Sequence, residues 1–247
     1  MTECRLLLDP PAEGAWNMAV DELLLDRAAE QGQPTLRFYA WRQATVSLGY
    51  FQGYASRWDH AASQSCPLVR RLSGGGAIVH DVELTYSLAL SAGHPLAAHA
   101  EDLYRAVHDA LVESLGWFGA RAEICAGGAG RKPQAEPFLC FQRRAAGDVL
   151  VDGEKIAGSA QRRRRGAILQ HGSVLLETSV AAPELPGLDA VVGLRLKPGE
   201  LTDHWGTILR ERLDLRWSHE PLSDTENRNV AELCARKYSD DAWSQRR

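Results

Sequence analysis

Residues 70–81 read Arg-Arg-Leu-Ser-Gly-Gly-Gly-Ala-Ile-Val-His-Asp, and the rest of the chain is organised around this stretch. The apolar residues on its two sides, Leu68–Val69 and Ala77–Val79, predict two strands joined through three consecutive glycines. Glycine has no Cβ, so a ligand can approach its main chain closely, and successive N–H groups in such a turn can bind an anion or a polarised carbonyl. A tight hairpin with surface arginines is the alternative interpretation.

The spacing within this glycine motif excludes two common phosphate-binding loops. No Gly-Lys-Ser/Thr follows the glycines, as a P-loop requires, and no Gly-x-Gly-x-x-Gly opens a helix, as a dinucleotide site requires. Arg70 and Arg71 carry planar donor groups that suit carboxylates and phosphates. The motif therefore predicts a binding loop of another kind.

Composition narrows the class of protein. The chain has 247 residues, 45% of them hydrophobic, and a net charge of −4, which suits one globular domain and gives no reason to expect nucleic-acid binding. We find no basic-then-apolar leader and no long apolar run, so we expect a cytoplasmic protein without a membrane contact. The five cysteines are widely spaced and include no Cys-x-x-Cys, which argues against disulfides and against a metal site.

Hydrophobic periodicity predicts an α+β fold, a mixed and largely antiparallel sheet flanked by helices. We expect helices at 14–31, more weakly at 57–65, and at 99–117, 199–213 and 223–238. Beyond the glycine motif, we expect strands at 34–41, 45–51, 84–91, 120–124, 148–151, 155–161 and 167–176. Residues 1–13 are expected to be a short lead-in, and 126–137, rich in Gly, Pro and Ala, a mobile loop.

Two residues outside the glycine motif are candidates for chemistry. Lys155 follows a predicted hairpin turn at Asp152-Gly153 and is one of only four lysines in an arginine-rich chain. It is either an exposed strand-end residue or a point charge that stabilises an oxyanion or a neighbouring thiolate. Cys140 is either a buried small hydrophobe or a nucleophile, and a cation beside it would make more thiolate available.

Histidines offer a weaker signal. His80 ends the glycine motif, and His171 lies in a Gln-His-Gly-Ser run. Each is either a general base or a hydrogen-bonded structural residue, and the second interpretation is the more common one. A Ser-His-Asp triad is compatible with the spacing, but no Gly-x-Ser-x-Gly elbow supports it.

Taken together, several motifs resemble the signatures of the lipoate–protein ligase and octanoyltransferase family. Besides 70–81, they are Gly-Glu-Lys-Ile-Ala-Gly-Ser-Ala-Gln at 153–161, His-Gly-Ser at 171–173, Asn-Met-Ala-Val-Asp-Glu at 17–22, Thr-Leu-Arg-Phe-Tyr at 35–39 and Ser-Leu-Gly-Tyr-Phe-Gln at 47–52. The resemblance implies the fold of the biotin/lipoate protein ligases (class II synthetase-like). It also implies a single catalytic domain over 1–247, with core motifs in 16–176 and a C-terminal helical extension at 199–240.

The resemblance also implies an acyl site for an octanoyl or lipoyl group. By position, Cys140 and Lys155 are its catalytic residues. The implied substrate-binding residues are Arg71, Ser73, Gly74, Gly75, Gly76, Ala77, Ile78, Val79, His80, Gly158, Ser159 and His171.

Two activities share these motifs. Cys140-Phe141, fifteen positions before Lys155, resembles the Cys-Phe pair of the octanoyltransferases, which hold octanoyl as a cysteine thioester. The ligases carry a Gly-Arg-Asn-Asp-like segment there, whereas Gly130-Arg131 is not followed by Asn-Asp, and the chain has no room for a further C-terminal domain. Both departures favour the transferase. A non-catalytic binder of acyl groups or lipoyl domains is a third hypothesis.

The transferase interpretation implies specific partners. Octanoyl-acyl carrier protein would be the donor, and a lipoyl domain or the glycine cleavage H protein the acceptor, for a monomeric enzyme without cofactor. ATP and Mg²⁺ are expected only if the protein is a ligase. Basic residues at 162–165, with Arg143 and Arg144, are a candidate docking surface for an acidic carrier.

Overall fold

A large mixed sheet forms the centre of the molecule. The computed structural model describes residues 1–127 and 137–246. In spatial order the strands of this sheet are β11 (Leu215–His219), β1 (Thr2–Leu8), β2 (Thr35–Tyr39), β6 (Glu83–Leu90), β10 (Ala167–Leu175), β9 (Glu154–Arg164), β8 (Val149–Val151) and β7 (Ala122–Ile124). β1 pairs in parallel with β11 and β2, and every other pairing is antiparallel. The predicted mixed, largely antiparallel sheet is confirmed.

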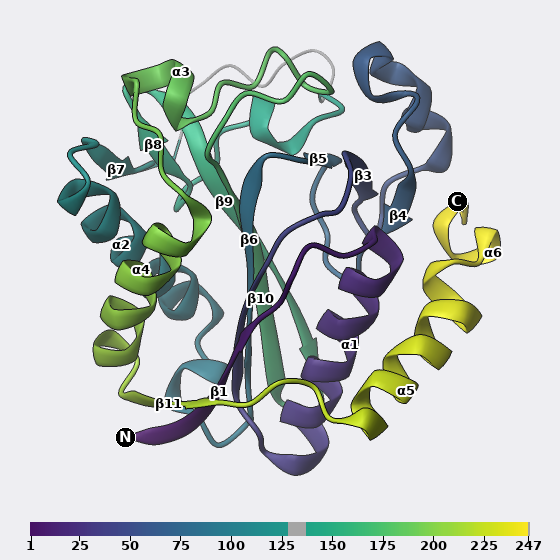
Figure 1. Ribbon diagram of the computed structural model, residues 1–247, viewed down its shortest axis with the longest axis vertical. Helices are drawn as coiled ribbons and strands as arrows, with labels where there is room; N and C mark the ends of the chain where they lie inside the picture. The colour runs from purple at the N-terminus through teal and green to yellow at the C-terminus, as the bar shows by residue number, and fades with distance from the viewer. Residues whose placement is uncertain (128–136, 247) are drawn as a thin grey trace.

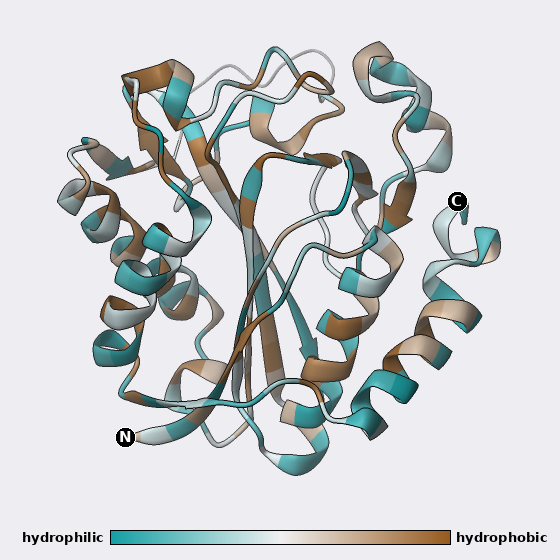
Figure 2. Cartoon of the chain, in the orientation of Figure 1, coloured by the Kyte–Doolittle hydropathy of each residue, from teal (hydrophilic) through white to brown (hydrophobic). Residues whose placement is uncertain are grey.

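Helices cover both faces of this sheet (Figure 1). On one face lie α2 (Ala100–Trp117), α3 (Leu188–Val192) and α4 (Pro198–Arg212), and on the other α1 (Gly14–Gln31) and α5 (Asp224–Leu233). Successive strand residues point to opposite faces, so Leu6 packs with α2 and α4 while Leu7 packs with α1. Figure 2 shows the resulting concentration of hydrophobic residues in the central strands. None of the helices in the described residues is long and apolar enough to cross a membrane.

A second sheet of three strands carries the glycine motif. Its order is β4 (Leu68–Arg70), β3 (Thr45–Leu48) and β5 (Ile78–His80). β4 and β5 therefore do not pair with each other, and each pairs with β3 instead. The alternative of a tight hairpin across the glycines is wrong, because a third strand separates the two that the glycines connect.

Several predicted elements need correction. Residues 1–13 are not a lead-in, because Thr2–Leu8 is the strand β1, buried on both faces. A strand of that kind lacks the polar alternation that would reveal it. β11, α3 and a short α6 (Asp241–Ser244) were also not predicted. In place of the helix predicted at 57–65 there are two 3-10 helices, Tyr54–Asp59 and Ala61–Ser63. A π-helical turn, Cys234–Tyr238, extends α5. Most of the predicted loop 126–137 lies outside the described residues.

A buried ion pair joins β1 to α5. The Arg5 guanidinium donates to both carboxylate oxygens of Glu226, at 2.8 and 3.1 Å, and both side chains are less than 10% exposed. The Glu226 carboxylate also accepts from the Ser223 amide and hydroxyl at the start of α5. Burial alone would raise the pKa of Glu226, but the hydrogen bonds from Arg5 and Ser223 lower it overall.

We expect Arg5→Met to lower the free energy of unfolding by about 3 kcal/mol, because the buried Glu226 carboxylate then loses its hydrogen-bonded cation and keeps only Arg27, 3.8 Å away and partly exposed. Urea denaturation at pH 7 measures the change. Arg216→Met is the matched control, since Arg216 pairs with Glu3 at 3.0 Å but both side chains are more than 60% exposed, and we expect a change below about 1 kcal/mol. Equal losses in the two variants would contradict the assignment.

The buried His108 on α2 is hydrogen-bonded to the large sheet and to the turn before β8. His108 is fully buried, and its Nδ1 lies 2.6 Å from the Gly147 carbonyl, which can only accept, so Nδ1 carries the proton. Nε2 then accepts from the Ser159 hydroxyl at 2.6 Å. Burial lowers the pKa of His108 from 6.5 to about 4, and Asp148 and the Gly147 carbonyl offset only part of that shift.

The lowered pKa of His108 predicts a pH dependence of stability. Above pH 6.5 the histidine is neutral in both folded and unfolded chains, whereas between pH 6.5 and 4 only the unfolded chain takes up the proton. We therefore expect His108 to account for a loss of about 3 kcal/mol of unfolding free energy as the pH falls through this window. Urea titrations of the wild type and His108→Gln at several pH values measure it. Parallel pH profiles for the two proteins would contradict the prediction.

Candidate active site

The glycine loop is held from inside by a buried arginine. The Arg71 side chain is 2% exposed and donates to the carbonyls of Ser47, Gly74 and Gly76 at 2.7–2.8 Å. Gly75 adopts a φ of 92°, in the left-handed region that favours glycine. The two arginines of the motif are therefore internal, since Arg70 is also buried and donates to the Ser244 and Gly49 carbonyls.

Arg71 places a positive charge beside the loop. Burial lowers its pKa to about 10, a shift that the neighbouring Cys140 partly opposes, so the guanidinium remains charged at neutral pH. Its Nε has no hydrogen-bond partner in the described chain. The terminal nitrogens already donate to the carbonyls of Ser47 on β3 and of Gly74 and Gly76 in the loop. Of the guanidinium, only the buried Nε–H is therefore left for the predicted contact with a substrate.

Cys140 is docked against the glycine loop by main-chain pairing. The Ala77 amide donates to the Phe138 carbonyl at 3.0 Å, and the Cys140 amide donates to the Ala77 carbonyl at 2.7 Å. Gly76 permits this approach, because a Cβ there would lie 3.1 Å from the Phe138 oxygen and 3.3 Å from the Cys140 nitrogen. A Cβ on Gly75 would lie 3.8 Å from the Cys140 sulfur. The cysteine therefore sits directly over the glycines.

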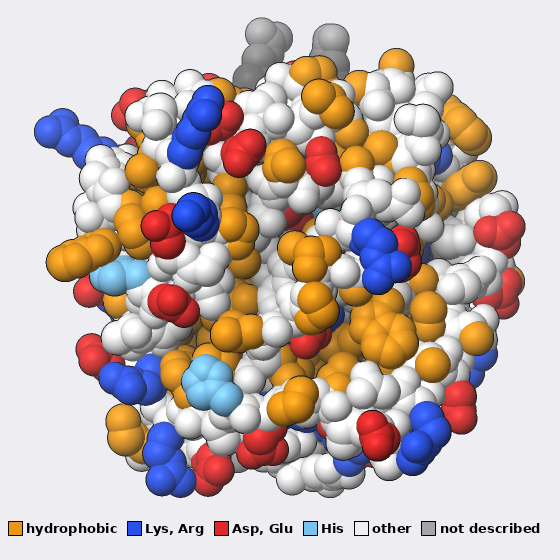
Figure 3. All heavy atoms as spheres, in the orientation of Figure 1, with side chains coloured by type: hydrophobic (Ala, Val, Ile, Leu, Met, Phe, Trp, Pro, Cys, Tyr) orange, Lys and Arg blue, Asp and Glu red, His pale blue; other side chains and the backbone are white. Residues whose placement is uncertain are grey.

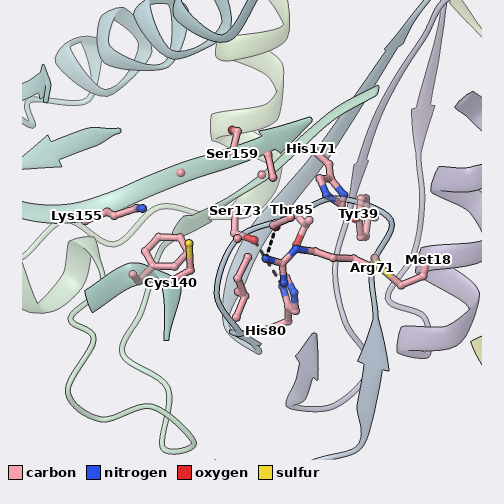
Figure 4. A pocket seen from close by; sticks show the side chains of 17 residues that line it. Met18, Tyr39, Arg71, His80, Thr85, Cys140, Lys155, Ser159, His171 and Ser173 are labelled. Atoms are coloured by element: carbon pink, nitrogen blue, oxygen red, sulfur yellow. Dashed lines mark hydrogen bonds between the residues drawn. The ribbon is translucent and has the colours of Figure 1, made fainter. Parts of the chain in front are cut away.

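Lys155 reaches the same place from β9. The pairing of β8 with β9 shifts register between Val149 and Leu150, where Leu150 pairs with Lys155 and Val149 with Ala157, and such an irregularity can re-aim a side chain. The Lys155 Nζ lies 2.8 Å from the Asp148 carboxylate and 5.2 Å from the centre of the Phe141 ring. Lys155 and Cys140 extend into one pocket, as Figure 4 shows.

This pocket holds about 500 Å³ of empty space, part of it open to solvent. Cys140 and Lys155 lie on one side of it, and His171, Tyr39 and Met18 lie on the opposite side (Figure 4). The lining residues are Met18, Tyr39, Arg71, Gly74, Gly75, Ile78, His80, Thr85, Cys140, Phe141, Lys155, Gly158, Ser159, Ala160, His171, Gly172 and Ser173.

The two histidines of the pocket belong to buried hydrogen-bond networks. His171 contacts the Asp21 carboxylate through Nδ1 at 2.9 Å and the Ser73 hydroxyl through Nε2. Burial would raise the pKa of Asp21, but the hydrogen bond to His171 and the charges around the carboxylate lower it overall. His80 contacts Glu83 through Nδ1 and the Ser47 hydroxyl through Nε2 at 2.7 Å.

Each network places a serine, a histidine and a carboxylate in the order of a hydrolase triad. However, Ser73 is only 1% exposed and lies outside the pocket lining, and Ser47 is fully buried. A nucleophile must reach its substrate, so these hydroxyls are better suited to holding the histidines in place. Trp41 stacks on the His80 ring at 3.9 Å and restricts that histidine further.

The structure brings most of the predicted site residues together. Those that line the pocket are Arg71, Gly74, Gly75, Ile78, His80, Cys140, Lys155, Gly158, Ser159 and His171, whereas Ser73, Gly76, Ala77 and Val79 do not. The alternation of a strand explains part of the division, since Ile78 and His80 point to one side of β5 and Val79 to the other, into a hydrophobic cluster. The same alternation places His171 and Ser173 on one side of β10. The position of Ser173 in the pocket could therefore have been predicted from that of His171.

Sequence reasoning missed the residues that support Lys155 and Ser159. None of these residues belongs to a motif that we recognised. Asp148 lies in the turn before β8, and Tyr104 and His108 lie on α2. Met18 and Tyr39 lie in stretches quoted as family patterns, but we did not place them in the site. Within residues 1–127 and 137–246, no three His, Cys, Asp or Glu side chains are grouped so that they could hold a metal ion.

Comparison with known proteins agrees with this geometry. Residues 13–187 match the lipoyl protein ligase A/B catalytic domain. The chain is 33% identical to the octanoyltransferase LipM of Moorella thermoacetica, over 98% of each chain, and 30% identical to the octanoyltransferase LipM of Clostridioides difficile, over the full length of both.

Solved structures show the same fold. A lipoate-protein ligase A bound with ATP superposes with a TM-score of 0.77 at 25% identity, over 99% of each chain. A bi-partite lipoate protein ligase from Thermoplasma acidophilum gives a TM-score of 0.75 at 24% identity, over 99% of this chain and 97% of that chain. The expected lipoate-ligase fold is confirmed. The chain belongs to the lipoyl protein ligase A/B catalytic domain family, as an enzyme whose full-length relatives are octanoyltransferases.

Proposed function

We propose that this protein is a cysteine-dependent octanoyltransferase of protein lipoylation. It takes octanoyl from the thioester of an acyl carrier protein, holds it on Cys140, and passes it to a lysine of a lipoyl-accepting protein of the glycine cleavage H type. The observation that carries the proposal is the main-chain docking of Cys140 on the glycine loop, in one pocket with Lys155. A cysteine held there, rather than in the hydrophobic core, is suited to meet a substrate.

The chemistry has two steps. In the first, the Cys140 thiolate attacks the octanoyl carbonyl, the new carbon–sulfur bond forms, and the carrier's thiolate leaves and takes up a proton. In the second, the neutral amine of the acceptor lysine attacks the acyl-enzyme, an amide forms, Cys140 leaves as a thiolate, and the nitrogen releases a proton to water. Each step passes through a tetrahedral intermediate with a negatively charged oxygen.

Two groups of the chain can stabilise that oxygen. The Lys155 ammonium lines the pocket, is only 5% exposed and supplies a positive charge there. Gly74 and Gly75 line the same pocket, and their amides have no partner among the hydrogen bonds of the described residues, so we propose these amides as donors. The overall transfer is balanced without an oxidant, a reductant or ATP.

The pocket suits an eight-carbon chain at its other end. Met18 and Tyr39 offer apolar surface opposite Cys140 (Figure 4). The Tyr39 ring is held by a hydrogen bond from its hydroxyl to Asp21 at 3.1 Å and by the Arg37 guanidinium 3.9 Å from its centre. A rigid aromatic wall of this kind limits how far an acyl chain can extend.

Part of the basic surface considered for carrier docking is already paired with acidic side chains. Arg164 pairs with Glu22 and Asp26, and Arg165 pairs with Glu30 at 2.8 Å, so these charges are already balanced. Arg164 also lies at the far end of β9 from Lys155, about 30 Å away by the rise of a strand. On the face in Figure 3, basic and acidic side chains are interspersed. Arg144, half exposed near the start of β9, is closer to the site.

We expect the wild-type protein, mixed with octanoyl-acyl carrier protein in the absence of ATP, to gain the mass of one octanoyl group that hydroxylamine removes. Cys140→Ala should show no adduct and lose at least about 1,000-fold of transfer activity, because the attacking group is gone. Intact mass spectrometry and transfer to an H-protein acceptor measure the two effects.

Cys66→Ala is the matched control, since Cys66 is partly exposed but lies outside the pocket, and it should acylate like the wild type. An adduct in Cys140→Ala at the wild-type level would exclude the cysteine mechanism. If acylation of the acceptor instead required ATP and the free acid, the protein would be a lipoate–protein ligase acting through an acyl-adenylate.

A further inference from the structure

The charge on Lys155 is enclosed by the protein. Its side chain is only 5% exposed, and burial away from water favours the neutral amine of a lysine unless an anion lies close by. The Asp148 carboxylate is that anion, with Oδ2 2.8 Å from Nζ, and it is itself only 3% exposed. Lys155 lines the pocket, whereas Asp148 is not among the lining residues and meets the lysine from outside them.

Asp148 is fixed from two further directions. Its Oδ1 accepts from the Tyr104 hydroxyl at 3.2 Å, and its Oδ2 accepts from the Ala145 amide at 2.7 Å. Burial, together with the nearby Asp148 charge, raises the pKa of Tyr104 far above its usual value, so the phenol stays a neutral donor. The carboxylate therefore has little freedom to turn away from Lys155.

Helix α2 supports both sides of this pair. Tyr104 and His108 are four residues apart and lie on the same side of the helix. Tyr104 also accepts from the Ser159 amide at 3.1 Å, and His108 connects the Ser159 hydroxyl to the carbonyl of Gly147, the residue before Asp148. The strand that carries Lys155 and the turn that carries Asp148 are thus held by one helix.

Gly158 supplies the space in which the pair lies. A Cβ there would be 2.7 Å from Lys155 Cε, 3.0 Å from Nζ and 3.2 Å from Asp148 Oδ1. The space that a side chain at position 158 would fill is therefore occupied by the Lys155–Asp148 pair. Any contact of Gly158 with the substrate comes in addition. Its φ is not in the left-handed region, so an alanine at this position displaces the pair without straining the backbone.

We propose that Asp148 is a positioning residue that keeps Lys155 charged and directed into the pocket beside Cys140, with Tyr104 fixing the carboxylate. The proposal rests on the octanoyltransferase function and deepens it. Asp148 touches neither the acyl group nor the sulfur, and it acts through the ammonium that meets the developing oxyanion.

The first test is the rate at which Cys140 acquires octanoyl, followed by rapid quench and intact mass. We expect Asp148→Asn, which keeps the shape but removes the charge, to slow acylation about 100-fold with little change in the half-saturating carrier concentration, and Asp148→Glu to recover part of the rate. Tyr104→Phe removes one hydroxyl and should slow it about 5-fold. Gly158→Ala should also slow it, because the pair is displaced.

Glu154→Gln is the matched control. Glu154 is the neighbour of Lys155 and pairs with Arg144, but both side chains are half exposed, so neutralising it should leave acylation unchanged. Urea denaturation of each variant separates loss of rate from loss of folding, and Tyr104→Phe keeps the proposal testable if Asp148→Asn does not fold. Wild-type acylation rates in folded Asp148→Asn and Tyr104→Phe would overturn the proposal.

A second measurement does not depend on acyl transfer. Cyanate carbamylates neutral amines and spares ammonium groups, so peptide mapping after cyanate treatment reports the state of Lys155. We expect carbamylation of Lys155 to rise about 10-fold in Asp148→Asn while exposed Lys197 reacts at an unchanged rate. An unchanged Lys155 rate would overturn the proposal even if acylation falls. A rise at Lys155 in a protein that forms no octanoyl adduct would support the pairing and refute the proposed function.

Discussion

The structure of the site depends on the main-chain pairing of Ala77 with Phe138 and Cys140. Two hydrogen bonds hold a segment that follows α2 and β7 in the chain against the glycine loop, and this close approach requires a surface without side chains. Gly75 and Gly76 provide that surface, and Arg71 holds the loop in shape by donating to three of its neighbouring carbonyls. The glycines therefore act first on the protein's own chain, and the pocket is the space that remains beside that contact.

This arrangement gives Arg71 a different role from the one its chemistry suggests. A guanidinium in a glycine-rich motif is usually expected to bind an external anion. Here four of its hydrogen bonds go to the Ser47 carbonyl and hydroxyl and to the Gly74 and Gly76 carbonyls. The positive charge still contributes to the potential in the pocket, but the planar donor group serves the loop. Of its nitrogens, only the buried Nε is without a hydrogen-bond partner among the described residues.

The C-terminal helices belong to the same physical unit as the glycine motif. Arg70 donates to the Ser244 and Arg246 carbonyls, and the Trp243 indole donates to the Arg70 carbonyl at 2.9 Å. Glu22 on α1 accepts from Lys237 and Tyr238. The end of the chain thus packs against the strand that leads into the loop. The similarity to the octanoyltransferases of Moorella thermoacetica and Clostridioides difficile likewise extends over nearly the whole chain, beyond the residues that form the pocket.

Local sequence determined the elements whose patterns are complete within one segment. The helices at 14–31 and 99–117, the glycine turn and the hairpin before Lys155 were predicted because periodicity, capping and turn chemistry depend on near neighbours. Tertiary structure alone decided that β1 and β11 join the sheet, that β3 separates β4 from β5, and that Asp148 and Tyr104 meet Lys155. Cys140 and Lys155 were recognisable from sequence as candidates, but the contact of Cys140 with Ala77 was not. Such contacts join residues far apart in the chain, and they form only because burial of the two cores brings those segments together.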